Sequence, residues 1–336
     1  MMTTTKPKRL KRAALVSATL AFSACSLHHV WMPASQPEEN WTDNSSLRGR
    51  SLSLVGVPPS NSYRGCRIPK EFRLSKGVTS PSYLASFHGG GKVLSNIVQA
   101  LTGIATTNQV NFSRRRIEHT VLFETHYPLH KAIKLEDDVD ADFRGTILLL
   151  RNPIADILSS FNAFYAHQYH YLMDDVRAPE GDWIRYRDSV QFAAQVKAYE
   201  RFVTYWMNKY KRKREDLLLI TYEGLTGGRG AIFTKQIGNF LQESKGVNVI
   251  DENSIQCVWE KFVHDEWYQD GGYQDGDASV TTTSFQERSD DRPFTQAQLR
   301  VVSNMLRGLE RRFGSDEQFS KIMNSYLKSL EDFIAK

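Results

Sequence analysis

The chain has 336 residues, of which 40% are hydrophobic and 24% are charged, and its formal net charge is +5. This composition suits one globular domain of ordinary make-up with a short appendage. The positive excess is small for this length, so it favours anionic ligands only weakly and gives no argument for a nucleic acid partner.

Residues 1–35 have the layout of a secretory signal. A positive flank, Lys6 to Arg12, precedes an uncharged apolar run from Ala13 to Cys25. The run is shorter than the roughly 20 apolar residues of a full bilayer span. A cleaved signal peptide and a signal anchor therefore both fit, and an organelle transit peptide is a third interpretation. We expect a protein of the secretory pathway, in the Golgi lumen as a type II membrane protein, or secreted if the signal is cleaved.

Residues 36–80 are polar and contain proline with little periodicity, which predicts a stem or linker. The glycosylation sequons begin at Asn40, Asn44 and Asn111. Because sequons also arise by chance, they support a lumenal location only together with the signal.

The chain has three cysteines, and Cys25 falls in the signal region. The other two, Cys66 and Cys257, either pair with each other or remain as two buried thiols. Spacing does not distinguish these alternatives, because disulfide connectivity cannot be deduced from sequence.

From residue 81 onward the hydrophobic pattern alternates between strands and helices. Short apolar runs typical of buried parallel strands read SYLASF, TVLFET, GTILLLRNP and DLLLITYEGL. Segments with helical periodicity follow them, at residues 92–102, 154–168, 189–213, 231–242, 255–260 and 295–313. The alternation predicts an α/β domain over residues 81–336, with a mostly parallel central sheet flanked by helices.

A glycine loop, SFHGGGKVL, joins the first of these strands to the first helix. Backbone N–H groups at such a helix start can cradle an anion. A nucleoside-triphosphatase P-loop requires glycine where Ser86 stands and a hydroxyl where Val93 stands, which disfavours magnesium-dependent kinase chemistry. The spacing of the glycines does not match a dinucleotide fingerprint either. By itself the loop is equally well explained as a tight turn.

Three further stretches place polar residues at strand ends, where the ligand crevices of open α/β sheets lie. RNPIADILSSF puts Arg151 directly after a strand and Ser159 two helical turns further on, so that both can address one phosphate. FETHYP puts His126 at the end of another strand, and ITYEGL does the same for Tyr222 and Glu223.

In this order the stretches resemble the sulfotransferase family, which uses 3′-phosphoadenosine 5′-phosphosulfate as donor. The family motifs are a loop of the type [YF]-P-x-S-G-[TN]-T-W, then T-H-x-P, R-x-P-x(5)-S and Y-E-[DG]-L. The resemblance spans about residues 82–225. It is greatest to membrane-anchored carbohydrate-type sulfotransferases, including those that accompany WSC domains, and it implies a P-loop nucleotide-binding, sulfotransferase-like architecture.

The resemblance also implies roles for individual residues. His126 would be the general base that deprotonates an acceptor hydroxyl, the acceptor being a glycan or glycoprotein. Arg151 and Ser159 would hold the 3′-phosphate of the donor, and Tyr222 would lie near its adenine. The 5′-phosphosulfate would be held by the loop residues His88, Gly89, Gly90, Gly91, Lys92 and Val93. The scheme requires no metal.

The chain departs from the family pattern at several of these positions. His88 replaces the loop proline, and Glu124 replaces a lysine often found two residues before the histidine. Gly89 stands where many members have a lysine that steadies the leaving oxygen, and we expect Lys92 to supply that charge as a second catalytic group. Arg288 is a weak candidate for the late donor-binding segment, with Arg292 as its alternative.

Each candidate also has a structural interpretation. His126 can be a strand-end histidine bonded to a carbonyl, Arg151 can hold a carboxylate such as Asp156, and Ser160 can take the place of Ser159. Two histidine pairs, His126 with His130 and His167 with His170, have helical metal-ligand spacing without an acidic or cysteine partner, so no metal site is expected. Two other functions stay open: a catalytically lapsed nucleotide- or glycan-binding relative, and a phosphate-loop nucleotide kinase.

Overall fold

The computed structural model describes residues 81–87, 90–108, 119–129, 143–169, 177–269 and 294–334. All of them lie in the second of the two units into which the chain divides, residues 59–336. Several features named above lie outside the described residues: the signal, the stem, the three sequons, His88, Gly89, His130, His170, Arg288 and Arg292. The side chain of His167 is also outside them.

Five strands form one sheet in which every pair is parallel. The strands are β1 (Ser82–Ser86), β2 (Thr106–Asn108), β3 (Leu122–Thr125), β4 (Thr146–Leu150) and β5 (Leu217–Thr221), and their order across the sheet is β2-β3-β1-β4-β5. The predicted α/β fold, with a parallel central sheet flanked by helices, is therefore confirmed. β1 and β4 are buried along their whole length, which explains why their sequences are apolar without interruption.

The helices are α1 (Gly91–Thr102), α4 (Pro153–Gln168), α5 (Glu180–Arg187), α6 (Val190–Lys209), α7 (Tyr222–Thr226), α8 (Gly230–Lys245), α9 (Glu252–Gln269), α11 (Gln296–Phe313) and α12 (Glu317–Ile334). Their ends follow local signals. α1 ends at Gly103, whose positive φ of 67° suits glycine, and Thr295 with Gln298 forms a capping box at the start of α11.

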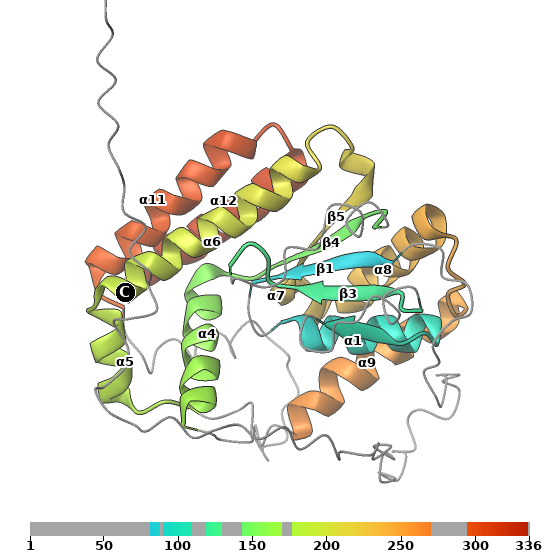
Figure 1. The fold of residues 1–336 in the computed structure, drawn as a ribbon, viewed down its shortest axis with the longest axis horizontal. Helices are drawn as coiled ribbons and strands as arrows, with labels where there is room; N and C mark the ends of the chain where they lie inside the picture. Colours follow the sequence, from blue (N-terminus) through green and yellow to red (C-terminus); the bar gives the residue numbers. More distant parts are fainter. Residues whose placement is uncertain are drawn as a thin grey trace, which may run out of the picture. The chain divides into compact units, whose positions relative to one another are not determined.

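The helices cover both faces of the sheet, and Figure 1 shows the two layers. Side chains alternate between faces along a strand. On β1, Tyr83 and Ala85 therefore join a core with α4, α6, α11 and α12, whereas Leu84 joins a second core with α1, α8 and α9. The first core is rich in aromatic rings, among them Trp206, whose indole N–H donates to the carbonyl of Tyr127. These two layers fix the positions of the segments that follow the strands.

Candidate functional site

The carboxyl ends of β1, β3, β4 and β5 meet at one edge of the sheet. Ser86 at the end of β1 is in register with Leu149 of β4, and Ala85 with Thr125 of β3. After β1 the chain passes to β2 on one side of the sheet, and after β4 it passes to β5 on the other. A ligand crevice is expected where neighbouring connections diverge in this way. The predicted site residues lie in the segments that follow these strands.

Two glycines stand at the start of α1, Gly90 as its cap and Gly91 as its first residue. Close neighbours leave little or no room for a side chain at either position. A Cβ at Gly90 would stand 3.0 Å from Leu149 and 3.1 Å from the ring of Tyr222, while one at Gly91 would stand 1.7 Å from Oε1 of Glu124. Gly90 caps the helix without a side-chain hydrogen bond. Next to them, Lys92 is exposed and Val93 packs, half-buried, against the second core. The start of α1 is thus closely surrounded by residues from β3, β4 and α7.

His126 directly follows β3, and its ring is oriented by β1. Its Nδ1 lies 2.9 Å from the carbonyl oxygen of Ser86 and 3.4 Å from the Ser86 hydroxyl. A carbonyl only accepts, so Nδ1 carries the proton and the lone pair of the neutral ring is on Nε2. His126 is therefore held in the tautomer that a base acting through Nε2 requires.

Glu124 lies on the same side of the sheet as His126, and it is half-buried. The Ser86 hydroxyl donates to its Oε1 over 3.4 Å. Burial raises the pKa of the Glu124 carboxyl above its ordinary value, although the charge of His126 and the hydrogen bond from Ser86 act in the opposite direction. Sequence analysis noted Glu124 as a departure from the family pattern, but it did not predict that this carboxyl lies against the start of α1.

Arg151 directly follows β4 and stacks on the tyrosine that follows β5. Its guanidinium carbon is 4.4 Å from the ring centroid of Tyr222. The carbonyl of Arg151 accepts a hydrogen bond of 2.8 Å from the hydroxyl of Tyr199 on α6, a fully buried residue. The face of the Tyr222 ring attracts the positive charge of Arg151, and a guanidinium offers N–H donors in a fork that can match a phosphate.

Glu223 on α7 is hydrogen-bonded both to the segment that follows β4 and to α12. Its Oε1 accepts 2.7 Å from the backbone N–H of Asn152, and its Oε2 accepts 3.1 Å from the hydroxyl of Tyr326 on α12. Burial raises the pKa of the Glu223 carboxyl, and these hydrogen bonds together with the charge of Arg151 offset part of that rise. The roles of Glu223, Tyr199 and Tyr326 as supports of this turn were missed from sequence, because each depends on contacts between distant segments.

Ser159 lies two turns along α4 and is half-buried. Among the described residues, no hydrogen bond joins its side chain to Arg151. Its neighbour Ser160 accepts a hydrogen bond of 2.9 Å from the side chain of Gln195 on α6, so Ser160 has a structural partner. The structure thus brings Arg151 and Tyr222 together and leaves Ser159 further along the helix.

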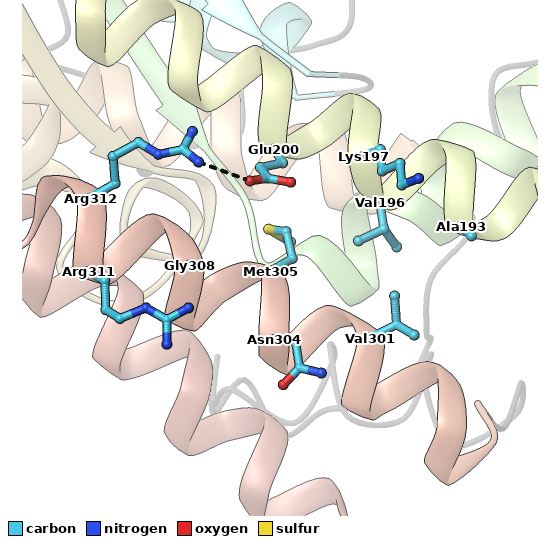
Figure 2. A pocket seen from close by; sticks show the side chains of 10 residues that line it. All are labelled: Ala193, Val196, Lys197, Glu200, Val301, Asn304, Met305, Gly308, Arg311 and Arg312. Atoms are coloured by element: carbon cyan, nitrogen blue, oxygen red, sulfur yellow. Dashed lines mark ion pairs between the residues drawn. The ribbon is translucent and has the colours of Figure 1, made fainter. Parts of the chain in front are cut away.

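A pocket lies elsewhere, between α6 and α11 (Figure 2). Apolar side chains, among them Val196 and Met305, form part of its lining. Arg312 is ion-paired with Glu200 over 3.5 Å at one end. None of the ten residues that line it belongs to the predicted site, and sequence analysis did not anticipate it.

The donor stays a prediction, and the residues at this edge differ in the charge that they would offer to it. Arg151 carries the positive charge that a phosphate requires. The carboxyl of Glu124 against Gly91 fits an anionic group only when it is protonated, because two negative charges at this distance repel. His126 has the orientation of a general base.

Comparison with known proteins gives no further assignment: no protein-family model matches the chain, and no curated protein matches it. Within the part of the chain that the structure describes, none of the helices combines the length and apolar character needed to cross a bilayer. The same residues contain no group of three or more His, Cys, Asp or Glu side chains arranged to hold a metal ion.

Proposed function

We propose that the protein is a sulfotransferase that transfers a sulfuryl group from 3′-phosphoadenosine 5′-phosphosulfate to a hydroxyl of a glycan or glycoprotein. One observation carries the proposal. At a single edge of a parallel sheet, an oriented histidine, a helix that begins with glycines, and an arginine stacked on a tyrosine follow neighbouring strands. The motif order of the sequence supports the same conclusion.

In this proposal two groups of residues bind the donor: one group follows β4 and β5, and the other lies at the start of α1 and in the loop before it. Arg151 binds the 3′-phosphate, aided by Ser159, and Tyr222 lies near the adenine. The backbone N–H groups at the start of α1, Gly90 to Val93, together with His88 and Gly89, hold the 5′-phosphosulfate. Arg288 is retained as a weak candidate for the same donor. The stacking of Arg151 on Tyr222 supports the first of these assignments.

His126 is proposed as the general base. Its Nε2 takes the proton of the acceptor hydroxyl as the hydroxyl oxygen forms its bond to sulfur, and a positioned base of this kind contributes roughly 10² to 10⁴-fold. The donor supplies the activated sulfuryl group, whose bond to the phosphate oxygen breaks in the same transfer. Lys92, exposed on the first turn of α1, is proposed to stabilise the negative charge that develops on that oxygen.

The location proposed for this activity is the lumen of the secretory pathway, in the Golgi or after secretion. Cys257 on α9 is disulfide-bonded, and the chain's two other cysteines lie outside the described residues. Disulfides persist in oxidising compartments. This bond supports the lumenal proposal, together with the signal and the sequons.

A second candidate function is a donor-binding relative that has lost catalysis, for example a glycan-binding protein. The observation that favours it is the carboxyl of Glu124 beside Gly91, where the family pattern has a cation nearby. The nucleotide kinase has less support, since Val93 packs against the core at the position where a magnesium-binding hydroxyl is required.

Calorimetric titration with 3′-phosphoadenosine 5′-phosphate tests the proposal. We expect micromolar binding that Arg151→Ala abolishes, while adenosine triphosphate with magnesium binds weakly or not at all. Lys209→Ala, which removes a cation from a cluster on Tyr83 and Trp206, serves as the control and should bind like the wild type. Absence of binding to the wild-type protein would contradict the sulfotransferase assignment. Binding without turnover on any acceptor would favour the non-catalytic relative.

A further inference from the structure

Glu124 occupies an unusual position for a carboxyl at a proposed anion site. Its Oε1 lies so close to Gly91 that a Cβ there would stand only 1.7 Å away, and the Ser86 hydroxyl donates to the same oxygen over 3.4 Å. The start of a helix carries partial positive charge on its N–H groups. A carboxylate at this place interacts favourably with that charge, and it also competes with any external anion for it.

Opposing influences act on the pKa of the Glu124 carboxyl. Burial raises the pKa of its carboxyl, while the charge of His126 and the hydrogen bond from Ser86 lower it. His126 lies two residues beyond Glu124, directly after the end of β3. On α1, Lys92 is exposed in the first turn, and Arg151 follows β4 on the far side of β1. Protonation of Glu124 therefore removes a negative charge from the place where the proposed phosphosulfate binds.

We propose that Glu124 makes anion binding at the start of α1 depend on pH. The ionised carboxylate repels a phosphate or phosphosulfate group beside Gly91, whereas the protonated carboxyl admits the group and donates a hydrogen bond to it. This inference rests on the proposed function, since it concerns the same donor site. It resolves the mismatch between Glu124 and an anionic donor, because binding becomes more favourable as the carboxyl takes up a proton.

The test is calorimetric titration of the whole protein with 3′-phosphoadenosine 5′-phosphate, from about pH 8 to about pH 5. The variants are Glu124→Gln, which keeps the shape of the side chain, and Glu124→Ala, which serves if the first fails to fold. Glu215→Gln is the matched control, because Glu215 is exposed and its substitution changes the net charge equally. Circular dichroism of each variant checks that it folds.

We expect Glu124→Gln to bind the bisphosphate about tenfold more tightly than the wild type at the alkaline end. This advantage should shrink as the pH falls and the wild-type carboxyl takes up its proton. The variant-to-wild-type ratio of affinities is the measured quantity, because titration of the ligand affects both proteins alike.

Three results would overturn the inference. Equal affinities of wild type and Glu124→Gln at every pH would show that the carboxyl does not reach the anion, while leaving the donor site intact. A gain in affinity shared by Glu215→Gln would assign the effect to net charge. Failure of all proteins to bind at any pH would remove the proposed donor site, and the inference with it.

Discussion

Glu223 is a buried carboxyl whose two oxygens accept hydrogen bonds from Asn152 and Tyr326. Because burial raises its pKa above the ordinary value of 4.5, the folded protein binds this proton more tightly than the unfolded chain does. Its contribution to the free energy of unfolding is therefore fully present below pH 4.5 and is lost as the pH rises through the raised pKa. The pKa of Glu124 is also raised, so its contribution to the free energy of unfolding is likewise lost as the pH rises.

We predict that Glu223→Gln makes the free energy of unfolding depend less steeply on pH in this window. The amide cannot ionise, so the variant should lose less stability than the wild type as the pH rises above 4.5. Urea unfolding at a series of pH values measures this, with Glu215→Gln as an exposed control. A slope equal to that of the wild type would mean that Glu223 titrates normally in the folded protein.

At the scale of elements, α12 supports the candidate site from outside the sheet. Its Tyr326 is buried and donates to Glu223, which in turn accepts from the first turn after β4. α11 and α12 also pack on the face that carries α6. The position of Arg151 therefore depends on a helix that lies more than a hundred residues later in the chain.

We predict that Tyr326→Phe lowers the free energy of unfolding by about 1–3 kcal/mol, because it removes the donor to a buried carboxyl oxygen. The ring stays in place, so packing is preserved. Tyr169→Phe, at an exposed ring, is the control and should change stability by less than about 0.5 kcal/mol. Chemical denaturation followed by circular dichroism gives both values, and equal stability of the two variants would contradict the proposed support.

Some elements could be predicted from sequence and others could not. The strands with uninterrupted apolar runs, such as GTILLLRNP, and the strongly periodic α11 were predicted close to their observed bounds. β2 has three residues and depends on pairing with β3, and α5 buries only Trp183, so neither has a readable period. α12 was overlooked although Phe319, Met323, Tyr326 and Leu330 follow a helical period.

In the candidate site too, some features could be predicted from the sequence and others could not. The residues that follow the strands were predicted to meet, because the carboxyl ends of parallel strands share an edge. Contacts that cross between layers were not predictable: Tyr199 with Arg151, and Glu124 with Gly91, join segments whose mutual distance only the folded chain defines. Strand ends also differ slightly, since Tyr222 begins α7 and does not end β5.

At the scale of the whole molecule, the disulfide at Cys257 links α9 to a part of the chain outside the described residues. We predict that Cys66 is the partner, because Cys25 lies in the predicted signal. Peptide mapping without reduction should recover the two cysteines joined. Cys257→Ser should lower stability by about 5 kcal/mol if the chain-entropy account of a long closed loop holds. A peptide that joins Cys25 to Cys257 would contradict this pairing and the cleavage of the signal.

The late position of α12 has a consequence for biosynthesis. Every strand of the sheet precedes α11 and α12, and β1 itself pairs with β3 and β4 from distant parts of the chain. An emerging polypeptide therefore leaves exposed the part of one apolar face that α4 and α6 do not cover, until these two helices have been made. Premature termination ahead of α12 leaves that part uncovered, a state that favours aggregation and retention by chaperones. Frameshifts just ahead of α12 should thus resemble early ones in the loss of protein that they cause.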